Sequence, residues 1–218
     1  NEATAVITGE QAAQLTELTL RDADGIEIGD IVCFNGLTAV HFVRQISPSQ
    51  MSALASLPLL TLVEVPSNYL TDLDWASALT GLVTLDVSGN VIQSTSAGAL
   101  APLVNLENLN ISSTNIVDIS ALAKMTKLVQ LDLSGDPVTD FSPLGSMPLL
   151  TSLSVANSQR DLAAIVAVAP NLTALNLHQT QVTELAPLAV YTGLNELDVS
   201  DNTFSDFTVL AGFRLCTC

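Results

Sequence analysis

The sequence predicts an α/β fold, a right-handed solenoid with a parallel concave β-sheet and short helical or irregular convex returns. Three observations predict it. An apolar pattern, LxxLxL, returns nine times within the 218 residues. A small polar residue follows most copies at a fixed distance, and two further apolar residues precede most new copies. Because a period of about 20 to 50 residues fixes the architecture, this repeat decides the fold class.

The nine LxxLxL patterns are evenly spaced. Their starts lie 22, 23, 22, 24, 22, 22, 22 and 22 residues apart. Alternate side chains of a strand point to opposite faces, so we expect the apolar residues of each pattern to face the core of one coil. The patterns begin at Leu15, Leu37, Leu60, Leu82, Leu106, Leu128, Leu150, Leu172 and Leu194.

A small polar side chain stands three residues after the last apolar residue of seven patterns. The chain must turn sharply there, and a buried amide or hydroxyl can satisfy backbone groups of the turn and of the next coil. Two apolar residues of the return, such as Leu54 and Leu57, then complete the core of the coil. The seven polar residues are Asn68, Asn90, Thr114, Asp136, Ser158, Thr180 and Asn202.

Two returns depart from this frame. In the seventh repeat Arg160 follows the turn, and residues 162–169 read as a short helix. The fourth repeat is lengthened to 24 residues through residues 93–101. Both changes fall on the convex side, so we expect the strands to be kept.

The period divides the chain into three parts. We expect residues 1–14 to form an N-terminal helical lead-in or cap, residues 15–215 an array of about nine repeats, and residues 216–218 the truncated start of a tenth repeat. Three explanations of this incomplete last repeat compete: a fragment of a longer protein, a native end sealed by Cys216 and Cys218, or an edge covered by another chain.

The remaining cysteine, Cys33, lies next to the core residue Phe34, so we expect a buried thiol.

The turn and the start of the return carry a resemblance to a known family. Residues 116–122 (IVDISAL) and 138–144 (VTDFSPL) share the frame I-x-D-x-S-x-L, and residues 182–188 (VTELAPL) and 204–210 (FSDFTVL) match it with substitutions. With its 22-residue period, the chain therefore resembles leucine-rich-repeat proteins of the short bacterial kind, as in internalins. The opening residues 7–20 also resemble the helical lead-in of such arrays. The resemblance implies a right-handed leucine-rich repeat solenoid from a secreted or surface-attached bacterial protein.

The outward residues of the strands define a candidate partner-binding surface on the concave face. This face is polar, small and acidic, and it lacks the Trp and Tyr cluster of a tight protein hot spot. At its N-terminal end Arg21, His41 and Arg44 form a basic cluster near Glu17 and Glu64, either an ion-pair patch or a carboxylate-binding spot. The candidate binding residues are Glu17, Arg21, His41, Glu64, Asp86, Asn110, Asp132, Asn176, His178 and Asp198.

Three interpretations of the concave face stay open. Its small polar residues can simply form a soluble surface. They can instead dock a partner with complementary basic or hydroxyl-rich groups. Glu64 and Asp86 can also form a Ca²⁺ site, although hard cations need about six or more oxygen ligands and two carboxylates supply few.

The charge balance excludes some partners. Six Lys and Arg residues against 22 Asp and Glu residues give a net charge of −16. We therefore expect no nucleic acid and no anionic membrane surface as partner, because both demand a basic footprint. The longest apolar stretch, residues 162–169, is too short to span a bilayer, so we expect no membrane insertion. Residues 1–10 do not resemble a signal peptide, which fits a cytosolic protein or a trimmed mature form.

The sequence carries no catalytic motif that we recognise. HExxH, GxSxG, GxxxxGK[ST] and GxGxxG are all missing. His41 and His178 lie six repeats apart, on the order of 30 Å, and cannot share a metal ion. We expect no enzymatic activity, no cofactor and no bound metal.

The expected function is recognition of a protein or glycan ligand through the concave face. The resemblance to internalins favours a secreted or cell-surface bacterial adhesin. Two other roles stay open: a cytoplasmic scaffold or regulatory subunit, and a structural spacer in a longer polypeptide. A precursor with a signal peptide and an anchor favours the adhesin, absence of both favours the scaffold, and large flanking domains favour the spacer.

Overall fold

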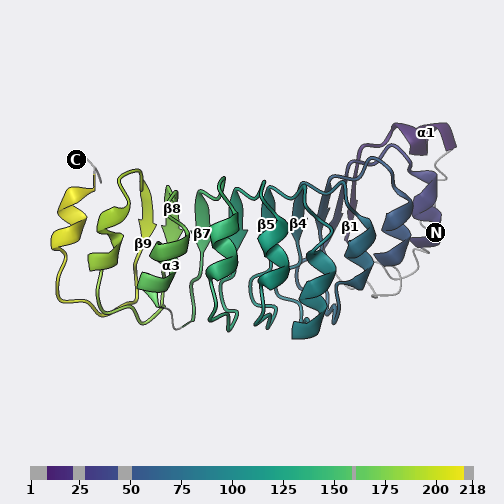
Figure 1. The fold of residues 1–218 in the computed structure, drawn as a ribbon. Helices are drawn as coiled ribbons and strands as arrows, with labels where there is room; N and C mark the ends of the chain where they lie inside the picture. The colour runs from purple at the N-terminus through teal and green to yellow at the C-terminus, as the bar shows by residue number, and fades with distance from the viewer. Residues whose placement is uncertain (1–8, 22–27, 44–50, 159–160, 214–218) are drawn as a thin grey trace.

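The chain coils into an elongated stack of strand-and-return units (Figure 1). A computed structural model describes residues 9–21, 28–43, 51–158 and 161–213. Within these residues, nine parallel strands form one sheet in sequence order, from β1 to β9. The expected solenoid with a parallel sheet is confirmed.

Each strand is short and coincides with one LxxLxL pattern. Neighbouring strands pair in a constant register, with Asp86 opposite Asn110 and Asn110 opposite Asp132. The strands are β1 (Glu17–Leu20), β2 (Ala39–Phe42), β3 (Leu62–Glu64), β4 (Thr84–Asp86), β5 (Asn108–Asn110), β6 (Gln130–Asp132), β7 (Ser152–Ser154), β8 (Ala174–Asn176) and β9 (Glu196–Asp198).

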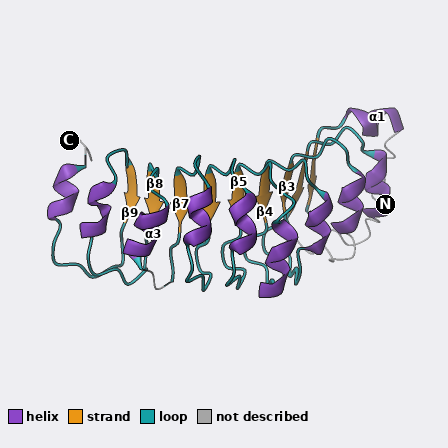
Figure 2. Ribbon diagram, viewed as in Figure 1, coloured by secondary structure: helices purple, strands orange, loops and turns teal. Residues whose placement is uncertain are grey.

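The returns form short helices on the side opposite the strands (Figure 2). Most are 3-10 helices, because their few residues must complete a return within the 22-residue period. They are η1 (Ile28–Cys33), η2 (Ser52–Ser56), η3 (Asp74–Ala78), η4 (Ser94–Leu100), η5 (Ser120–Lys124), η6 (Ser142–Ser146), η7 (Ala186–Val190) and η8 (Thr208–Gly212).

The two irregular returns differ as the sequence predicts. The seventh contains an α-helix, α3 (Leu162–Val168), which begins where the Asp161 carboxylate accepts the N–H of Ala164 at 3.2 Å. Pro170 follows shortly after its end, where a helix cannot continue. The lengthened fourth return forms η4, which has 7 residues where η3 and η5 have 5.

One hydrophobic core fills the solenoid between the sheet and the returns. The apolar residues of the central patterns, such as Leu82, Leu85 and Val87, are fully buried. Leu100 and Leu103 of the following return close the same core from the convex side. The apolar positions predicted from the period are therefore core residues throughout the central coils.

The polar residues after the strands form a ladder inside the turns, which we call the inner ladder. The side-chain oxygen of Asn90 accepts the N–H groups of Asn68 and Leu70 in the preceding coil, both at 2.9 Å. Its amide nitrogen donates to the carbonyls of Val65 and Val87 at 2.9 and 2.7 Å. Asn90 therefore satisfies backbone groups of its own turn, as predicted, but the second coil that it bonds is the preceding one and not the next. The members are Asn68, Asn90, Thr114, Asp136, Ser158, Thr180 and Asn202.

The residue before each member of the inner ladder adopts a left-handed backbone. Gly89 and Gly135 occupy two of these positions, with φ of 67° and 75°. A Cβ atom on Gly89 would lie 2.6 Å from the Ser67 hydroxyl, so glycine also relieves a close approach between coils. The other five are Ser67, Ser113, Asn157, Gln179 and Asp201.

The N-terminal region brings one correction. Cys33 is exposed, so the expectation of a buried thiol is wrong. Ile31 is buried and Phe34 packs against the core, whereas the intervening Val32 and Cys33 point to solvent. The short helix α1 (Gly9–Gln14) precedes β1 and buries Ala12.

The division into lead-in, array and truncated tenth repeat stays a prediction. Its last part, with Cys216 and Cys218, lies outside the described residues. No helix in the part of the chain that the structure describes is long and apolar enough to cross a bilayer.

Candidate functional site

The concave face presents one column of polar side chains from successive strands, which we call the concave column. The strand register aligns Glu64 with Asp86, Asp86 with Asn110, and Asn110 with Asp132. These side chains are half-buried, while Asp198 at the end of the sheet is exposed. The column consists of Glu64, Asp86, Asn110, Asp132, Ser154, Asn176 and Asp198.

The concave column lies along a shallow groove. A hollow of about 290 Å³ extends from Glu64 on β3 to Ser154 on β7. A second hollow of about 190 Å³ begins at Ser152 and Ser154 and reaches Asp198 on β9. Because the two hollows share residues, the groove is continuous over seven strands. It brings together six of the predicted site residues: Glu64, Asp86, Asn110, Asp132, Asn176 and Asp198.

Local hydrogen bonds fix the direction of the carboxylates. One oxygen of Asp86 accepts the N–H of Ser88 at 2.8 Å, and the other accepts the Asn110 amide at 3.1 Å. Asp132 accepts the N–H of Ser134 at 2.8 Å in the same way. These bonds within and between coils orient the acceptor atoms before any partner arrives, which lowers the entropy cost of binding.

Asp198 repeats this arrangement at the exposed end of the sheet. Its carboxylate accepts the Ser200 hydroxyl at 2.6 Å and the Ser200 N–H at 2.9 Å. The Ser200 side chain and backbone lower the pKa of Asp198 below its ordinary value, because both bonds favour the charged form. Asp198 is therefore ionised at neutral pH.

A histidine lies between two glutamates at the N-terminal end of the sheet. The Nδ1 atom of His41 lies 2.7 Å from Glu64, and its Nε2 atom lies 3.3 Å from Glu17. Of the two interpretations of the basic cluster, these contacts favour an ion-pair patch over a carboxylate-binding spot. Arg21 is exposed directly after β1, and Arg44 lies outside the described residues.

The second histidine stands at the other end of the sheet. His178 follows β8, and its Nδ1 atom lies 2.8 Å from the Ser200 hydroxyl. Its Nε2 atom lies 3.7 Å from Asp201. The structure therefore places six of the ten predicted residues in a central groove, with His41 beside Glu17 and Glu64 at one end and His178 at the other, while Arg21 stands exposed after β1.

The groove carries negative charge along the strands that the structure describes. No Lys or Arg occurs on the described strands β1 to β9. Five carboxylates line the strands from β3 onward: Glu64, Asp86, Asp132, Glu196 and Asp198. Among the described residues, no group of three or more His, Cys, Asp or Glu side chains could hold a metal ion. A Ca²⁺ site built on Glu64 and Asp86 gains no support from this arrangement.

The groove also contains residues that the candidate set leaves out. Thr84, Asn108, Gln130 and Ser152 stand two residues before the concave column and line the central hollow. The Asn108 amide donates to the Thr84 hydroxyl at 3.3 Å across two strands. The strand alternation that selects the concave column also places this second column outward, so the signal was present in the sequence.

Comparisons with known proteins agree with this architecture. Family models for leucine-rich repeats match residues 58–116 and, as a two-copy repeat, residues 104–146. An internalin from Listeria monocytogenes, inlF, superposes with a TM-score of 0.78 at 22% identity, over 99% of this chain and 71% of that chain. Internalin C2 from the same organism gives 0.58 at 25% identity, over 94% and 80%.

A third solved structure lies outside the internalins. TLR13, in a complex with ssRNA13, gives a TM-score of 0.70 at 18% identity, over 94% of this chain and 35% of that chain. No curated protein matches the sequence. The chain contains leucine-rich repeats, which the family models match over residues 58–146. Its solenoid has an internalin-like fold, as its repeat frame predicts.

Proposed function

We propose that the chain is a non-catalytic recognition module that binds a protein partner through the concave groove. The observation that carries the proposal is the continuous row of oriented acceptors from Glu64 to Asp198. A stack of coils holds such a row rigid, because each coil is fixed by its two neighbours. Leucine-rich repeats serve as protein-binding modules, and this groove gives that role a specific chemistry.

The partner is expected to be basic and rich in hydrogen-bond donors. Asp86 and Asp132 present carboxylate oxygens whose direction is already fixed by Ser88 and Ser134. Lys and Arg side chains of a partner would meet no competing cation on the described strands. The net charge of −16 would also accelerate the approach of a basic partner and would repel nucleic acid.

The internalin-like solenoid supports a secreted or surface-attached bacterial protein, with an adhesive role. A cytoplasmic scaffold and a spacer in a longer polypeptide are the competing roles. The precursor distinguishes the three. A signal peptide with an anchoring segment favours the adhesin. A precursor that lacks both favours the scaffold, and large flanking domains favour the spacer.

A crosslinking pull-down with matched charge variants tests the proposal. The groove variant changes Glu64, Asp86, Asp132 and Asp198 to Ser. The control variant changes four exposed acids outside the groove to Ser: Glu10, Asp74, Glu107 and Glu184. Both variants lose four negative charges, so a difference between them reflects position and not net charge.

We expect host-cell surface extracts to yield a protein that the wild type and the control variant capture and the groove variant does not. Capture by all three forms would place binding outside the groove and overturn the proposal. Capture of a glycan that the groove variant loses would keep the site and change the partner class. A failure of all forms to capture anything would favour the spacer.

A further inference from the structure

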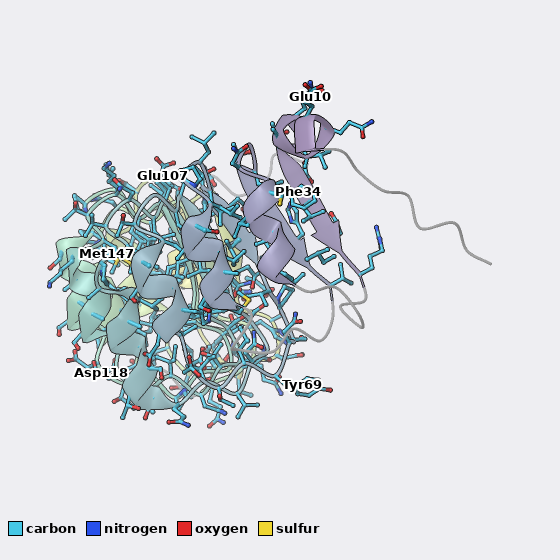
Figure 3. The ribbon with its side chains drawn as sticks, turned by 90° about the vertical axis from the view of Figure 1, so that its right-hand side faces the viewer. Glu10, Phe34, Tyr69, Glu107, Asp118 and Met147 are labelled. Atoms are coloured by element: carbon cyan, nitrogen blue, oxygen red, sulfur yellow. The ribbon has the colours of Figure 1, made fainter. Side chains whose placement is uncertain are left out.

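A second surface stands at the edge where the strands end and the chain turns into the returns, which we call the turn edge. Three large apolar side chains are exposed there on consecutive coils. Tyr69 is 74% exposed, Val91 59% and Val117 47%. Figure 3 shows Tyr69 pointing away from the molecule at its lower right, and Asp118 at its lower left.

Hydrogen bonds between coils align the turns that carry these residues. The N–H groups on either side of Tyr69 both bond to the side chain of Asn90, directly before Val91. The N–H of Ile92, directly after Val91, donates to the carbonyl of Thr114 in the coil that carries Val117. Tyr69 and Val91 therefore occupy one repeat position on neighbouring coils, and Val117 stands on the next coil, two residues beyond that position. We call these three exposed side chains the stripe.

The backbone of Tyr69 is unsuited to tyrosine. Its φ is 60°, in the left-handed region that side chains with a Cβ atom occupy at a cost. The equivalent residue two coils later is Asn115, with φ of 67°, and asparagine tolerates this conformation. Because the Tyr69 ring is also exposed, neither the backbone nor the core explains an aromatic residue there. Contact with another molecule does explain it.

Acidic side chains flank the stripe where the returns begin. Asp118 accepts the N–H of Ser120 at 2.8 Å, and Asp140 accepts the N–H of Ser142 at 2.9 Å. The hydrogen bonds from these serines lower the pKa of both carboxyls, so both are ionised at neutral pH. Within the described residues, no Lys or Arg forms an ion pair with either one.

We propose that the turn edge binds a basic segment of a protein partner, at a site separate from the concave groove. A guanidinium or ammonium group would stack on the exposed ring of Tyr69. The aliphatic parts of the segment would cover Val91 and Val117, and a second cation would pair with Asp118 and Asp140. From Tyr69 to Asp140 the site crosses about 15 Å of sheet, which an extended segment of about five residues covers.

Other exposed apolar residues do not form such a stripe. Leu59 and Leu149 occupy one repeat position, but three coils separate them, which carry Gly81, Asn105 and Lys127 at that position. Leu149 is therefore a suitable control: it is as exposed as Val91 and has no aromatic residue on a neighbouring coil at its position.

The test uses a fluorescein-labelled peptide that alternates arginine and leucine, RLRLR, with ELELE as the peptide control. Fluorescence anisotropy gives the Kd of each peptide for the full chain and for its variants. Tyr69→Asn is expected to weaken RLRLR binding by about tenfold. The double variant Asp118→Asn with Asp140→Asn is expected to weaken binding and its salt dependence. Leu149→Asn is expected to leave the Kd unchanged.

Thermal unfolding separates recognition from a structural role. Because asparagine suits a left-handed backbone, Tyr69→Asn is expected to keep or raise the Tm while it weakens binding. A lower Tm would assign the ring a structural role and overturn the proposal. So would RLRLR binding that Tyr69→Asn leaves unchanged. Loss of peptide binding in the groove variant alone would also overturn it, while supporting the concave site.

Discussion

Two aspartates of one coil, Asp132 and Asp136, show how position determines the role of a side chain in this molecule. Asp132 belongs to the concave column, is half-buried and faces the groove. Asp136 belongs to the inner ladder and is 0% exposed. The first is available to a partner, whereas the second serves the backbone of the preceding coil. The residue type alone distinguishes neither role.

Asp136 and Asn90 hold equivalent positions in the inner ladder but form different sets of hydrogen bonds. Asp136 accepts the N–H groups of Thr114 and Ile116 at 2.8 and 3.2 Å, as Asn90 does for its own preceding coil. The Asn90 amide also donates to two carbonyls, which an ionised carboxylate cannot do. Burial raises the pKa of Asp136 to about 6, although the hydrogen bonds from Thr114 oppose the shift.

The largest effect is expected at the apolar residue between these two surfaces. Leu131 is buried and lies directly before Asp132. Leu131→Ala is expected to lower the free energy of unfolding by about 2 to 5 kcal/mol, because it leaves a cavity between tightly stacked coils. Urea denaturation measures this change. An unchanged midpoint would show that Leu131 does not belong to the core.

A polar change in the inner ladder is expected to cost nearly as much. Asn90→Ala leaves the N–H groups of Asn68 and Leu70 without their acceptor in a buried turn. We expect a loss of about 3 kcal/mol in the free energy of unfolding. The control is Asn108→Ala on the concave face, where we expect a loss below about 1 kcal/mol. Equal losses in both variants would contradict the distinction between ladder and groove.

Asp136→Asn is expected to stabilise the protein at neutral and alkaline pH. Because the pKa of Asp136 is about 6 in the folded state and 3.8 in the reference state, folding takes up a proton between these values. The stability contributed by the protonated form is therefore present below pH 4 and lost as pH rises through 6. Above pH 7 the wild type is expected to be less stable than the variant, by at most about 3 kcal/mol.

Thermal unfolding from pH 4 to pH 8 measures this difference. The Tm gap between Asp136→Asn and the wild type should widen as pH rises. Carboxylates with lowered pKa, such as Asp118 and Asp140, act in the opposite sense below pH 4, but they are common to both proteins and cancel. A gap that stays constant with pH would show that Asp136 is ionised throughout.

The sequence predicts the coil positions well, because a fixed period and strand alternation assign each residue a side. That is why Leu131 and Asp136 are predicted inward and Asp132 outward. The prediction fails at Cys33 because it rested on the neighbouring core residue Phe34 and not on the period. Ile31 and Phe34 hold the two core positions of this return, and Cys33 between them faces solvent.

Three-dimensional properties of the two sites exceed what the repeat encodes. Strand alternation places the column of Thr84 and Asn108 outward, but the volume of the groove that this column lines depends on the sizes of side chains from several strands and was not predicted. The left-handed backbone of Tyr69 was not predicted either, because its repeat position holds Tyr69, Val91, Asn115, Pro137 and Gln181 in different coils. A position with so many residue types gives no consistent conformational signal.

The smallest effect on stability is expected in the concave column. Glu64, Asp86, Asp132 and Asp198 have solvent-accessible carboxylates, and serine can accept the same turn hydrogen bond at three of these positions. We expect each change to Ser to alter the free energy of unfolding by less than about 0.5 kcal/mol. The lost attraction between Glu64 and His41 is partly offset by weaker repulsion between like charges along the groove. If the groove variant unfolds at the same temperature as the Glu10, Asp74, Glu107 and Glu184 control, the concave column does not support the fold and its residues are free to be selected for binding. A much lower unfolding temperature of the groove variant would instead make the column a structural ladder like the inner one.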